Sequence, residues 1–393
     1  MYCCSGTTGT YLAALYTVWY NEAMVFGIDA REIQNGVFTG IGRALFNFLD
    51  FFGKQSDEHR CVLFSEHPVN VISAERIRQV AVPSKNTFYW DQISLPRLIA
   101  THAVDRFYSP YYKVPVNTSV PILSTIFDLM YIYYPIKWRG TGLFSRLYYR
   151  IIGSLMIKKA HTIFTCSEYS KSEITRFYPV HSEKVKVIYL GLSDHYQPTT
   201  DEDKIDQVKK KYGISRPFVL YTGNFKPHKN VETLIDAFSK VRSTATDLQL
   251  VLAGNNTDEN FKRLQPVIKQ FEASDTLVIT GLVSLEEQIA LYSSALMYVC
   301  PSLYEGFGYP PLEAMACGAP VISSDRTSLK EIVGDAALLC NPLQVEDIAD
   351  KIMQLCKNST LRKDLHNRGR KQAQKFTNDI FCRQFYSLLT TFA

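Results

Sequence analysis

The sequence lacks several features that would place it in a specialised class of protein. No stretch of its 393 residues approaches the about 18–20 consecutive apolar residues that a membrane-spanning helix requires. Its nine cysteines are an odd number without a C-x-x-C pair or a Cys/His ligand spacing, which argues against a disulfide framework and structural zinc. The acidic run Asp201–Asp203 lies in a polar stretch rather than after a strand, so we expect no metal site there. These absences favour a reducing, cytoplasmic compartment.

Length and charge indicate two domains of different electrostatic character. A chain of this length fits two domains of about 150–200 residues each. Its 46% hydrophobic and 21% charged residues are typical of an ordinary globular protein. Residues 1–195 contain 20 Lys and Arg against 15 Asp and Glu, whereas residues 196–393 contain 23 of each class. The first half therefore carries the net charge of +5, which favours an anionic neighbour such as a membrane surface or a phosphorylated acceptor. We expect no nucleic-acid partner.

From Met24 onward, short apolar runs alternate with helical patterns. Near-continuous apolar strands separated by helices are typical of a parallel sheet covered on both faces. The expected strands are 25–29, 60–64, 104–108, 120–127, 162–166, 185–190, 218–222, 248–253, 277–280, 296–300, 320–323 and 337–339. The clearest expected helices are 39–52, 91–100, 142–159, 168–178 and one that ends at 295 and begins with the capping box Ser284-Leu285-Glu286-Glu287. The pattern predicts an α/β protein with two doubly wound, Rossmann-like domains facing each other across a cleft.

A polar, charged stretch separates the two sets of elements. The first residues contain an apolar run, Tyr11–Tyr20, without the preceding Lys or Arg of a signal peptide, so we interpret them as a dispensable extension. The expected parts are an extension at 1–23, an N-terminal domain at 24–195, a linker and lead-in helix at 196–216, a C-terminal domain at 217–375, and a C-terminal helix at 376–393 that returns to the N-terminal domain.

The segment 301–318 carries the densest set of candidate functional residues. It follows an expected strand, and Gly306 and Gly308 allow the backbone to approach a ligand closely. Two consecutive prolines then favour a helix start. We therefore expect Glu305 on the loop and Glu313 in the first turn of the helix.

The backbone of this loop favours an anion. The amides of Phe307, Gly308 and Tyr309 precede or open the helix, and the helix dipole adds to their attraction for negative charge. Two carboxylates that flank such a loop suit a ligand with both phosphate and hydroxyl groups. Each glutamate alone has a simpler interpretation, Glu305 as a solvated loop residue and Glu313 as a partner of the helix dipole. The pair around a glycine-rich loop favours a site.

The sequence from Glu305 to Glu313, E-G-F-G-Y-P-P-L-E, followed by A-M-A-C-G-A-P-V-I, resembles the signature of family-4 retaining glycosyltransferases. The resemblance extends from Met24 to the C-terminus. It implies the GT-B fold of two Rossmann-like domains, independence of metal ions, and no cofactor beyond the nucleotide-sugar substrate. It also implies that Glu305 contacts the hydroxyls of the donor sugar and that Glu313 binds the ribose diol of the nucleotide.

The loop T-G-N-F-K-P-H-K-N resembles the family's strand-end loop, in which an Arg and a Lys bind the donor pyrophosphate. Gly223 opens this loop and Lys229 falls on the Lys position. Asn224 stands where the family usually has the Arg, so Lys226 or His228 would supply part of the missing charge. A purely surface role for Lys229 is unfavourable because a cation beside a helix N-terminus needs an accompanying anion.

Three further segments resemble the family. Gly36–Arg43 is similar to the glycine loop that faces the diphosphate and the acceptor, which assigns Gly40 to the donor. Thr125–Leu129 is similar to the family's T-x-H-D-L and retains Asp128, but Phe127 replaces the His. Ser167–Lys171 is similar to an S-E-x-S-K turn, which we interpret as a packing and capping element.

Residues after a later strand complete the expected donor site. Leu282 and Val283 stand where the family's backbone contacts the nucleotide base. The resemblance thus assigns as catalytic Lys229, Glu305 and Asp128, and as donor-binding Gly40, Gly223, Asn224, Leu282, Val283, Phe307, Gly308, Tyr309 and Glu313.

A basic segment, Lys137–Lys159, has six Lys and Arg and no acidic residue, interleaved with aromatic and aliphatic side chains. Such a helix is typical of contact with a membrane interface. An ordinary core-packed helix with solvated Lys and Arg explains the pattern about as well. The charge asymmetry of the chain favours contact with the inner face of the cell membrane.

The resemblance implies a retaining hexosyltransferase. The P-H-K-N loop is similar to that of bacterial mannosyltransferase-like members of the family, which build surface polysaccharide. GDP-mannose is the preferred donor and UDP-hexoses remain open, with a glycan or lipid-linked glycan as acceptor. Three alternatives remain: a nucleotide-sugar isomerase or hydrolase, a non-catalytic nucleotide- or carbohydrate-binding partner, and a nicotinamide oxidoreductase that uses Gly40, Gly42 and Glu66. The oxidoreductase lacks the third glycine of its motif and leaves the Glu305–Glu313 segment unexplained.

Overall fold

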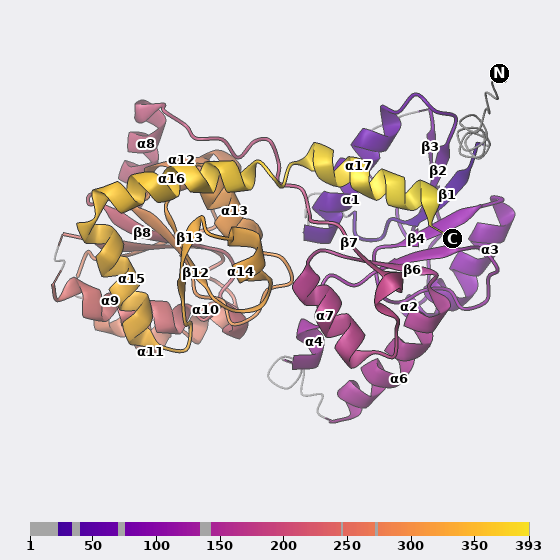
Figure 1. Cartoon of the computed structure of the whole chain (residues 1–393), viewed down its shortest axis with the longest axis horizontal. Helices are drawn as coiled ribbons and strands as arrows, with labels where there is room; N and C mark the ends of the chain where they lie inside the picture. The colour runs from indigo at the N-terminus through magenta and orange to yellow at the C-terminus, as the bar shows by residue number, and fades with distance from the viewer. Residues whose placement is uncertain are drawn as a thin grey trace, which may run out of the picture. The chain divides into compact units, whose positions relative to one another are not determined.

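The computed structural model describes residues 23–33, 40–69, 75–133, 143–244, 247–271 and 274–392 (Figure 1). Three expectations fall wholly or partly outside these residues. They are the extension at 1–23, the part of the glycine loop before Gly40, and the start of the basic segment, whose described side chains begin at Arg150.

The strands of the first half form a seven-stranded sheet in the order β3-β2-β1-β4-β5-β6-β7, and the pairing registers described are parallel. Their bounds are β1 Val25–Asp29, β2 Arg60–Ser65, β3 Ile77–Ala81, β4 Arg106–Ser109, β5 Ile122–Thr125, β6 Thr162–Thr165 and β7 Val185–Val187. Six of these strands confirm expected ones, although β5 and β7 are shorter than predicted. The sequence did not predict β3, because this edge strand pairs only with β2 and carries exposed polar side chains instead of an apolar run.

Helices connect these strands. They are α1 Gly40–Gly53, α2 Thr87–Tyr89, a π-helical turn η1 Trp90–Ser94, α3 Leu95–Thr101, α4 Met130–Tyr133, α6 Leu143–Lys159, α7 Glu168–Phe177 and the short η2 Ser182–Lys184. The helix expected at 91–100 begins earlier, because the Asn86 side chain accepts a hydrogen bond from Tyr89 N and caps it there.

The second half forms a six-stranded parallel sheet in the order β10-β9-β8-β11-β12-β13. Its strands are β8 Phe218–Thr222, β9 Gln249–Ala253, β10 Leu277–Gly281, β11 Met297–Cys300, β12 Val321–Ser324 and β13 Ala337–Cys340. The helices are α8 Glu202–Tyr212, η3 Pro227–Lys229, α9 Val231–Arg242, α10 Glu259–Lys262, α11 Gln265–Ile268, η4 Lys269–Phe271, α12 Leu285–Ser294, α13 Tyr309–Ala316, α14 Thr327–Val333, α15 Val345–Lys357, α16 Ser359–Ala373 and α17 Asn378–Thr391. All six strands confirm expected ones, and Ser284 and Glu287 form the predicted capping box of α12.

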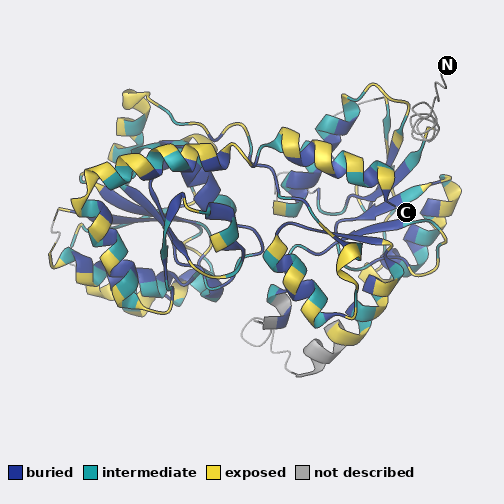
Figure 2. Ribbon diagram, in the orientation of Figure 1, coloured by how far each residue is buried: buried dark blue, intermediate teal, exposed yellow. Residues whose placement is uncertain are grey.

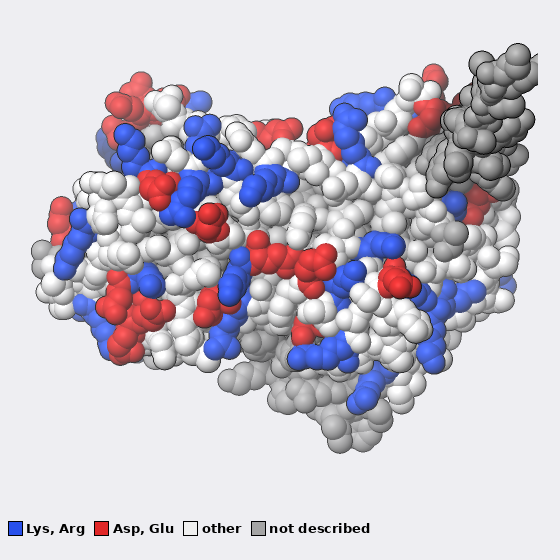
Figure 3. Space-filling view, in the orientation of Figure 1, with Lys and Arg blue, Asp and Glu red and all other residues white. Residues whose placement is uncertain are grey.

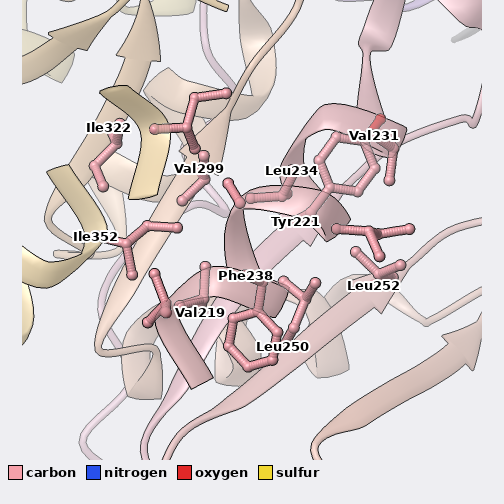
Figure 4. Close-up of a cluster of buried hydrophobic side chains, with 14 of the residues drawn as sticks. Val219, Tyr221, Val231, Leu234, Phe238, Leu250, Leu252, Val299, Ile322 and Ile352 are labelled. Carbon is pink, nitrogen blue, oxygen red and sulfur yellow. The ribbon is translucent and has the colours of Figure 1, made fainter. Parts of the chain in front are cut away.

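A continuous apolar core lies between the six-stranded sheet and two of its helices. Val219 and Leu250 of the strands pack with Leu234 and Phe238 of α9 and with Ile352 of α15 (Figure 4). The central strands of this sheet are buried, and the helices turn exposed side chains outward (Figure 2). The α/β fold with two parallel, Rossmann-like sheets is therefore confirmed.

Contacts divide the chain into two compact units. The first comprises Met1–Pro110 and Val114–Ile122, and the second comprises Tyr111–Lys113 and Leu123–Ala393. Strands β1 to β4 belong to the first unit, whereas β5 from Leu123 onward, β6, β7 and the whole six-stranded sheet belong to the second. The expected domain boundary between residues 195 and 217 stays a prediction.

Helix α17 packs on β6 within the second unit. The rings of Phe381 and Phe385 lie 6.2 and 5.3 Å from the ring of Phe164. The chain reaches α17 beside the linker, where Leu192 N donates to Phe376 O at 2.6 Å. The last helix is thus anchored to a strand that lies more than 200 residues earlier in the sequence.

Basic and acidic side chains lie interspersed on the face shown in Figure 3. Among the helices of the described residues, none combines the length and the apolar character that crossing a bilayer demands. The same part of the chain contains no group of three His, Cys, Asp or Glu residues placed to bind a metal ion. Its seven cysteines are free thiols.

Candidate functional site

Two loops of the second sheet meet at the point where the strand order reverses. From β8 the chain continues outward to β9 and β10, whereas β11 begins the opposite half of the sheet. Ligands of such sheets bind outside the carboxyl ends of the strands at this switch point. Lys229 lies on the loop after β8, and Glu305 lies on the loop after β11. The sheet topology therefore brings together two residues that are 76 positions apart.

Hydrogen bonds attach the loop after β8 to its neighbours. The Asn230 side-chain amide donates to Pro301 O at 3.2 Å and to Pro342 O at 2.6 Å. Leu303 N donates to His228 O at 2.7 Å. These bonds fix the backbone on both sides of Lys229 and hold it at the carboxyl edge of the sheet.

Lys229 and Glu305 form a largely buried ion pair. Lys229 Nζ lies 2.5 Å from Glu305 Oε1, and the two side chains are 12% and 14% exposed. The Ser302 hydroxyl donates to the same carboxylate oxygen at 2.8 Å. Within the described part of the chain, Glu305 is the one hydrogen-bond acceptor of Nζ, although an ammonium group has three protons to donate. The pair can therefore accept a further anionic or hydroxyl-bearing partner.

The two charges stabilise each other. Burial alone would raise the pKa of Glu305, but Lys229 and the Ser302 hydroxyl lower it below its ordinary value. Burial likewise opposes the charge of Lys229, and Glu305 nevertheless raises its pKa. Both groups are thus ionised near neutral pH.

His228 does not supply the missing charge of the family's Arg. Burial, assisted by the positive charge of Lys229, lowers the pKa of His228 to about 4, so the ring is neutral near pH 7. Lys226 remains the candidate for that charge. Partial burial and the positive charge of Lys229 lower the pKa of Lys226. Lys226 is therefore a second cationic side chain near Lys229. Asn224 itself is exposed and offers no positive charge.

Glu313 occupies a different environment from Glu305. The prediction that it lies in the first turn of its helix is wrong. Helix α13 begins at Tyr309, because Pro310 and Pro311 fit its first turn, where backbone N–H groups need no partner in the helix. Glu313 therefore falls in the second turn and is 5% exposed. Its Oε2 accepts hydrogen bonds from Tyr292 OH at 3.1 Å and from Gln288 Nε2 at 3.3 Å.

The loop between the two glutamates is held by the start of α14. Glu305 N donates to Thr327 Oγ1 at 3.2 Å. The Ser328 hydroxyl donates to Glu305 O at 2.8 Å and to Phe307 O at 2.7 Å. With the carbonyls engaged in this way, the amides of Phe307 and Gly308 find no acceptor in the described part of the chain. Two N–H groups at the start of a helix are thus available to an anion.

Asp128 lies against this loop in the second unit. A Cβ atom on Gly306 would come within 2.8 Å of Asp128 Cβ, so the approach requires glycine. Asp128 Oδ1 accepts from Met130 N at 2.9 Å. Burial and the nearby charge of Glu305 raise the pKa of Asp128. The Gly306 carbonyl accepts from the Ser167 hydroxyl at 2.9 Å, so the Ser167–Lys171 turn holds the loop as well as capping α7.

Three glycines follow neighbouring strands at the same edge. Gly223, Gly254 and Gly281 end or follow β8, β9 and β10. A Cβ on Gly254 would lie 2.0 Å from Gly223 O, which leaves no room for any side chain there. Beyond them Leu282 is 77% exposed, and Val283 is half-buried. The loops after β8 and β9 therefore pack backbone against backbone, whereas the side chain of Leu282 is exposed beyond β10. Gly40, by contrast, begins α1 in the first unit.

Sequence reasoning missed the polar residues that support the two glutamates: Thr222, Gln288, Tyr292 and Ser302. Ser302 had a local signal, since it lies three residues before Glu305 on the same loop. Tyr292 and Gln288 had none, because they lie on α12, which reads as an ordinary amphipathic helix and contacts Glu313 only through the fold.

Two family descriptions match the chain. "Glycosyltransferase Family 4" matches residues 39–195, and "Glycosyl transferases group 1" matches residues 203–372. The chain belongs to glycosyltransferase family 4. This confirms the family that the Glu305–Glu313 segment resembles.

This glycosyltransferase has bacterial relatives. It is 32% identical over 222 residues to O-antigen chain mannosyltransferase B of Escherichia coli, a match of 56% of this chain and 58% of the relative. It is 32% identical over 248 residues to O-antigen chain mannosyltransferase RfbU of Salmonella typhimurium, a match of 62% of this chain and 64% of the relative. The chain thus spans less than two thirds of the length of these relatives.

Solved structures share its fold. Anabaena Alr3699/HepE in complex with UDP-glucose matches with a TM-score of 0.73 and 16% identity, over 94% of this chain and 100% of that one. Sucrose-phosphate synthase from Thermosynechococcus elongatus matches with a TM-score of 0.73 and 20% identity, over 93% and 98%. These likenesses confirm that the two Rossmann-like domains of this glycosyltransferase form the GT-B fold.

Proposed function

We propose that this glycosyltransferase moves a hexose from a nucleotide diphosphate sugar to a hydroxyl of a glycan or lipid-linked glycan. The transfer retains the anomeric configuration and uses neither a metal ion nor another cofactor. The observation that carries the proposal is the buried Lys229–Glu305 pair at the switch point of the second sheet. Mannose from GDP-mannose is the proposed donor group, because O-antigen mannosyltransferases stand among the relatives. UDP-hexoses are the alternative, since HepE with UDP-glucose has the same fold.

The geometry suggests how the bond to the donor sugar would break. Cleavage at the anomeric carbon leaves negative charge on the departing diphosphate. Lys229 Nζ and the available amides of Phe307 and Gly308 would stabilise that charge. Glu305 would orient the sugar, Asp128 would contact the acceptor side, and the leaving phosphate would take the proton of the incoming hydroxyl on the same face.

We also propose that the basic segment Lys137–Lys159 contacts the cytoplasmic membrane surface. Ile151 and Leu155 lie one turn apart on α6 and are 51% and 54% exposed, with exposed Arg150 and Lys158 beside them. Apolar side chains flanked by cations suit an anionic lipid surface. The double variant Ile151→Ser/Leu155→Ser should lose co-sedimentation with phosphatidylglycerol vesicles, and unchanged co-sedimentation would refute the contact.

A transfer assay tests the proposed activity. The purified chain is incubated with GDP-mannose or UDP-glucose and a lipid-linked glycan, with and without EDTA, and NMR identifies the anomeric configuration of the product. We expect transfer from one donor, retention of configuration and no effect of EDTA. Donor consumption that is independent of the acceptor would indicate a hydrolase or isomerase, and binding without consumption would indicate a non-catalytic partner.

A thermal unfolding screen narrows the choice of donor before the assay. A ligand at 100 times its dissociation constant should stabilise the chain by about 2.7 kcal/mol, which is enough to rank GDP, UDP and dTDP.

A further inference from the structure

A buried polar network surrounds the carboxylate of Glu313. Tyr292 OH lies 3.1 Å from Glu313 Oε2 and 2.5 Å from Thr222 Oγ1. Gln288 Nε2 lies 3.3 Å from both Tyr292 OH and Glu313 Oε2. Tyr292 is fully buried, and Thr222 is the last residue of β8. The network therefore ties a carboxylate on α13 to the carboxyl end of a central strand.

Donor and acceptor chemistry sets the direction of each hydrogen bond. An ionised carboxylate can only accept, so the Tyr292 hydroxyl and the Gln288 amide donate to Glu313. Tyr292 has a single hydroxyl proton, so its oxygen accepts from Thr222. Burial raises the pKa of Tyr292 well above its ordinary value, which keeps that proton in place at neutral pH. Tyr196 OH lies 3.4 Å from Gln288 Oε1, which turns the Nε2 atom toward the carboxylate.

We propose that Tyr292 and Gln288 are positioning residues that fix the Glu313 carboxylate as a hydrogen-bond acceptor for the ribose hydroxyls of the nucleotide. The inference rests on the proposed function and on the family resemblance, which implies that Glu313 binds the ribose. A carboxylate held on one oxygen by two donors has little freedom left to lose when a ligand binds. The network would therefore set the preference of the enzyme for ribonucleotides over 2′-deoxyribonucleotides.

The test compares the dissociation constants of GDP and UDP with those of their 2′-deoxy forms by calorimetry. The wild type should bind the ribonucleotide about tenfold or more tightly than the deoxy form, the effect of one hydrogen bond to a charged group. Tyr292→Phe and Gln288→Leu should each reduce this ratio about threefold or more. Each substitution should weaken the binding of the ribonucleotide and leave the binding of the 2′-deoxy form nearly unchanged.

Tyr298→Phe is the matched control. Tyr298 is also fully buried, and its hydroxyl lies 3.4 Å from Thr222 O without a described hydrogen bond to Glu313. This variant should keep the wild-type ratio, and thermal unfolding checks that every variant is folded. If Tyr292→Phe and Gln288→Leu weaken the binding of ribo and 2′-deoxy forms equally, or if both keep the wild-type ratio of dissociation constants, the positioning role is overturned.

The proposed function can fail separately. A wild-type ratio near one would overturn the assignment of Glu313 to the ribose and the positioning role with it. Failure of the wild type to transfer any hexose, with the ratio and its loss as expected, would leave the positioning role intact and overturn only the proposed activity.

Discussion

Each of the two sheets carries a buried ion cluster at its switch point, but the two clusters are built differently. In the first unit Arg31 follows β1, next to the point where the strand order turns to β4. Its Nε lies 3.0 Å from Asp29 Oδ1, and its Nη2 lies 2.6 Å from Asp29 Oδ2 and 2.7 Å from Asp91 Oδ1. The guanidinium also lies over the ring of Trp90, 5.3 Å from its centroid.

The cluster of the second unit is simpler. Lys229 meets one oxygen of Glu305, next to a loop with available amides. The Arg31 guanidinium binds both oxygens of the Asp29 carboxylate and one oxygen of Asp91, and it lies over the Trp90 ring. These contacts hold η1 against the end of β1. In the described part of the chain the Lys229 ammonium has one protein acceptor, so it keeps hydrogen-bonding capacity for a ligand. A switch point marks where a site can form, and we propose that the hydrogen-bonding capacity left on its cation decides whether that site takes an anion.

Arg31→Met should give the largest effect and break the first cluster. The substitution leaves Asp29 and Asp91 without their cation, and Asp29 is fully buried. We expect the free energy of unfolding to fall by about 3–5 kcal/mol in urea denaturation. The control is Arg383→Met, which removes an exposed pair with Asp379 and should cost less than about 1 kcal/mol. Equal losses of unfolding free energy in Arg31→Met and Arg383→Met would show that the Arg31 cluster does not stabilise the fold.

Lys229→Ala and Glu305→Ala should each lower turnover by about 100-fold or more, because each removes a group that the proposed function places on the leaving diphosphate or on the sugar. Initial rates of hexose transfer measure the effect. Near-wild-type rates in both purified variants would remove the site assignment.

The double variant Lys229→Met/Glu305→Gln sharpens the contrast between the clusters. It should be more stable than Lys229→Met alone, because it leaves no unpaired charge in the buried site. It should nevertheless remain as inactive as the single variants. A double variant that recovers transfer along with stability would mean that the pair serves only the fold.

His228 gives the smallest expected effect, through pH. Its folded pKa of about 4 lies below the value near 6.5 that an unfolded chain has, so the unfolded state binds more protons between these values. Stability is therefore fully present above about pH 6.5 and is lost as the pH falls toward 4. From pH 7 to 5 this group should cost about 2 kcal/mol. His228→Gln should lose that share of the acid sensitivity in urea denaturation, whereas exposed His181→Gln should not. Parallel pH profiles for the wild type and His228→Gln would contradict the prediction.

Local patterns predicted much of the fold. Val25–Asp29 and Phe218–Thr222 are strands at the predicted bounds, and Ser284 caps the predicted helix, because apolar runs and caps act over a few residues. The edge strand Ile77–Ala81 escaped prediction since a strand with one neighbour needs no apolar run. Glu313 lies in the second turn of α13 rather than the predicted first turn, because a helix can begin one or two residues before its prolines.

By itself, the sequence determined the α/β alternation, the strand-end loops and the presence there of Lys229, Glu305 and Glu313. Only the tertiary structure decided which of these residues meet and what supports them. Lys229 and Glu305 are 76 positions apart, Arg31 and Asp91 are 60 apart, and Tyr292 reaches Glu313 from another helix. Such contacts depend on which strands are neighbours and on how helices pack over them. Spacing along the chain carries little information about either, since the order of strands in a sheet differs from their order in the sequence.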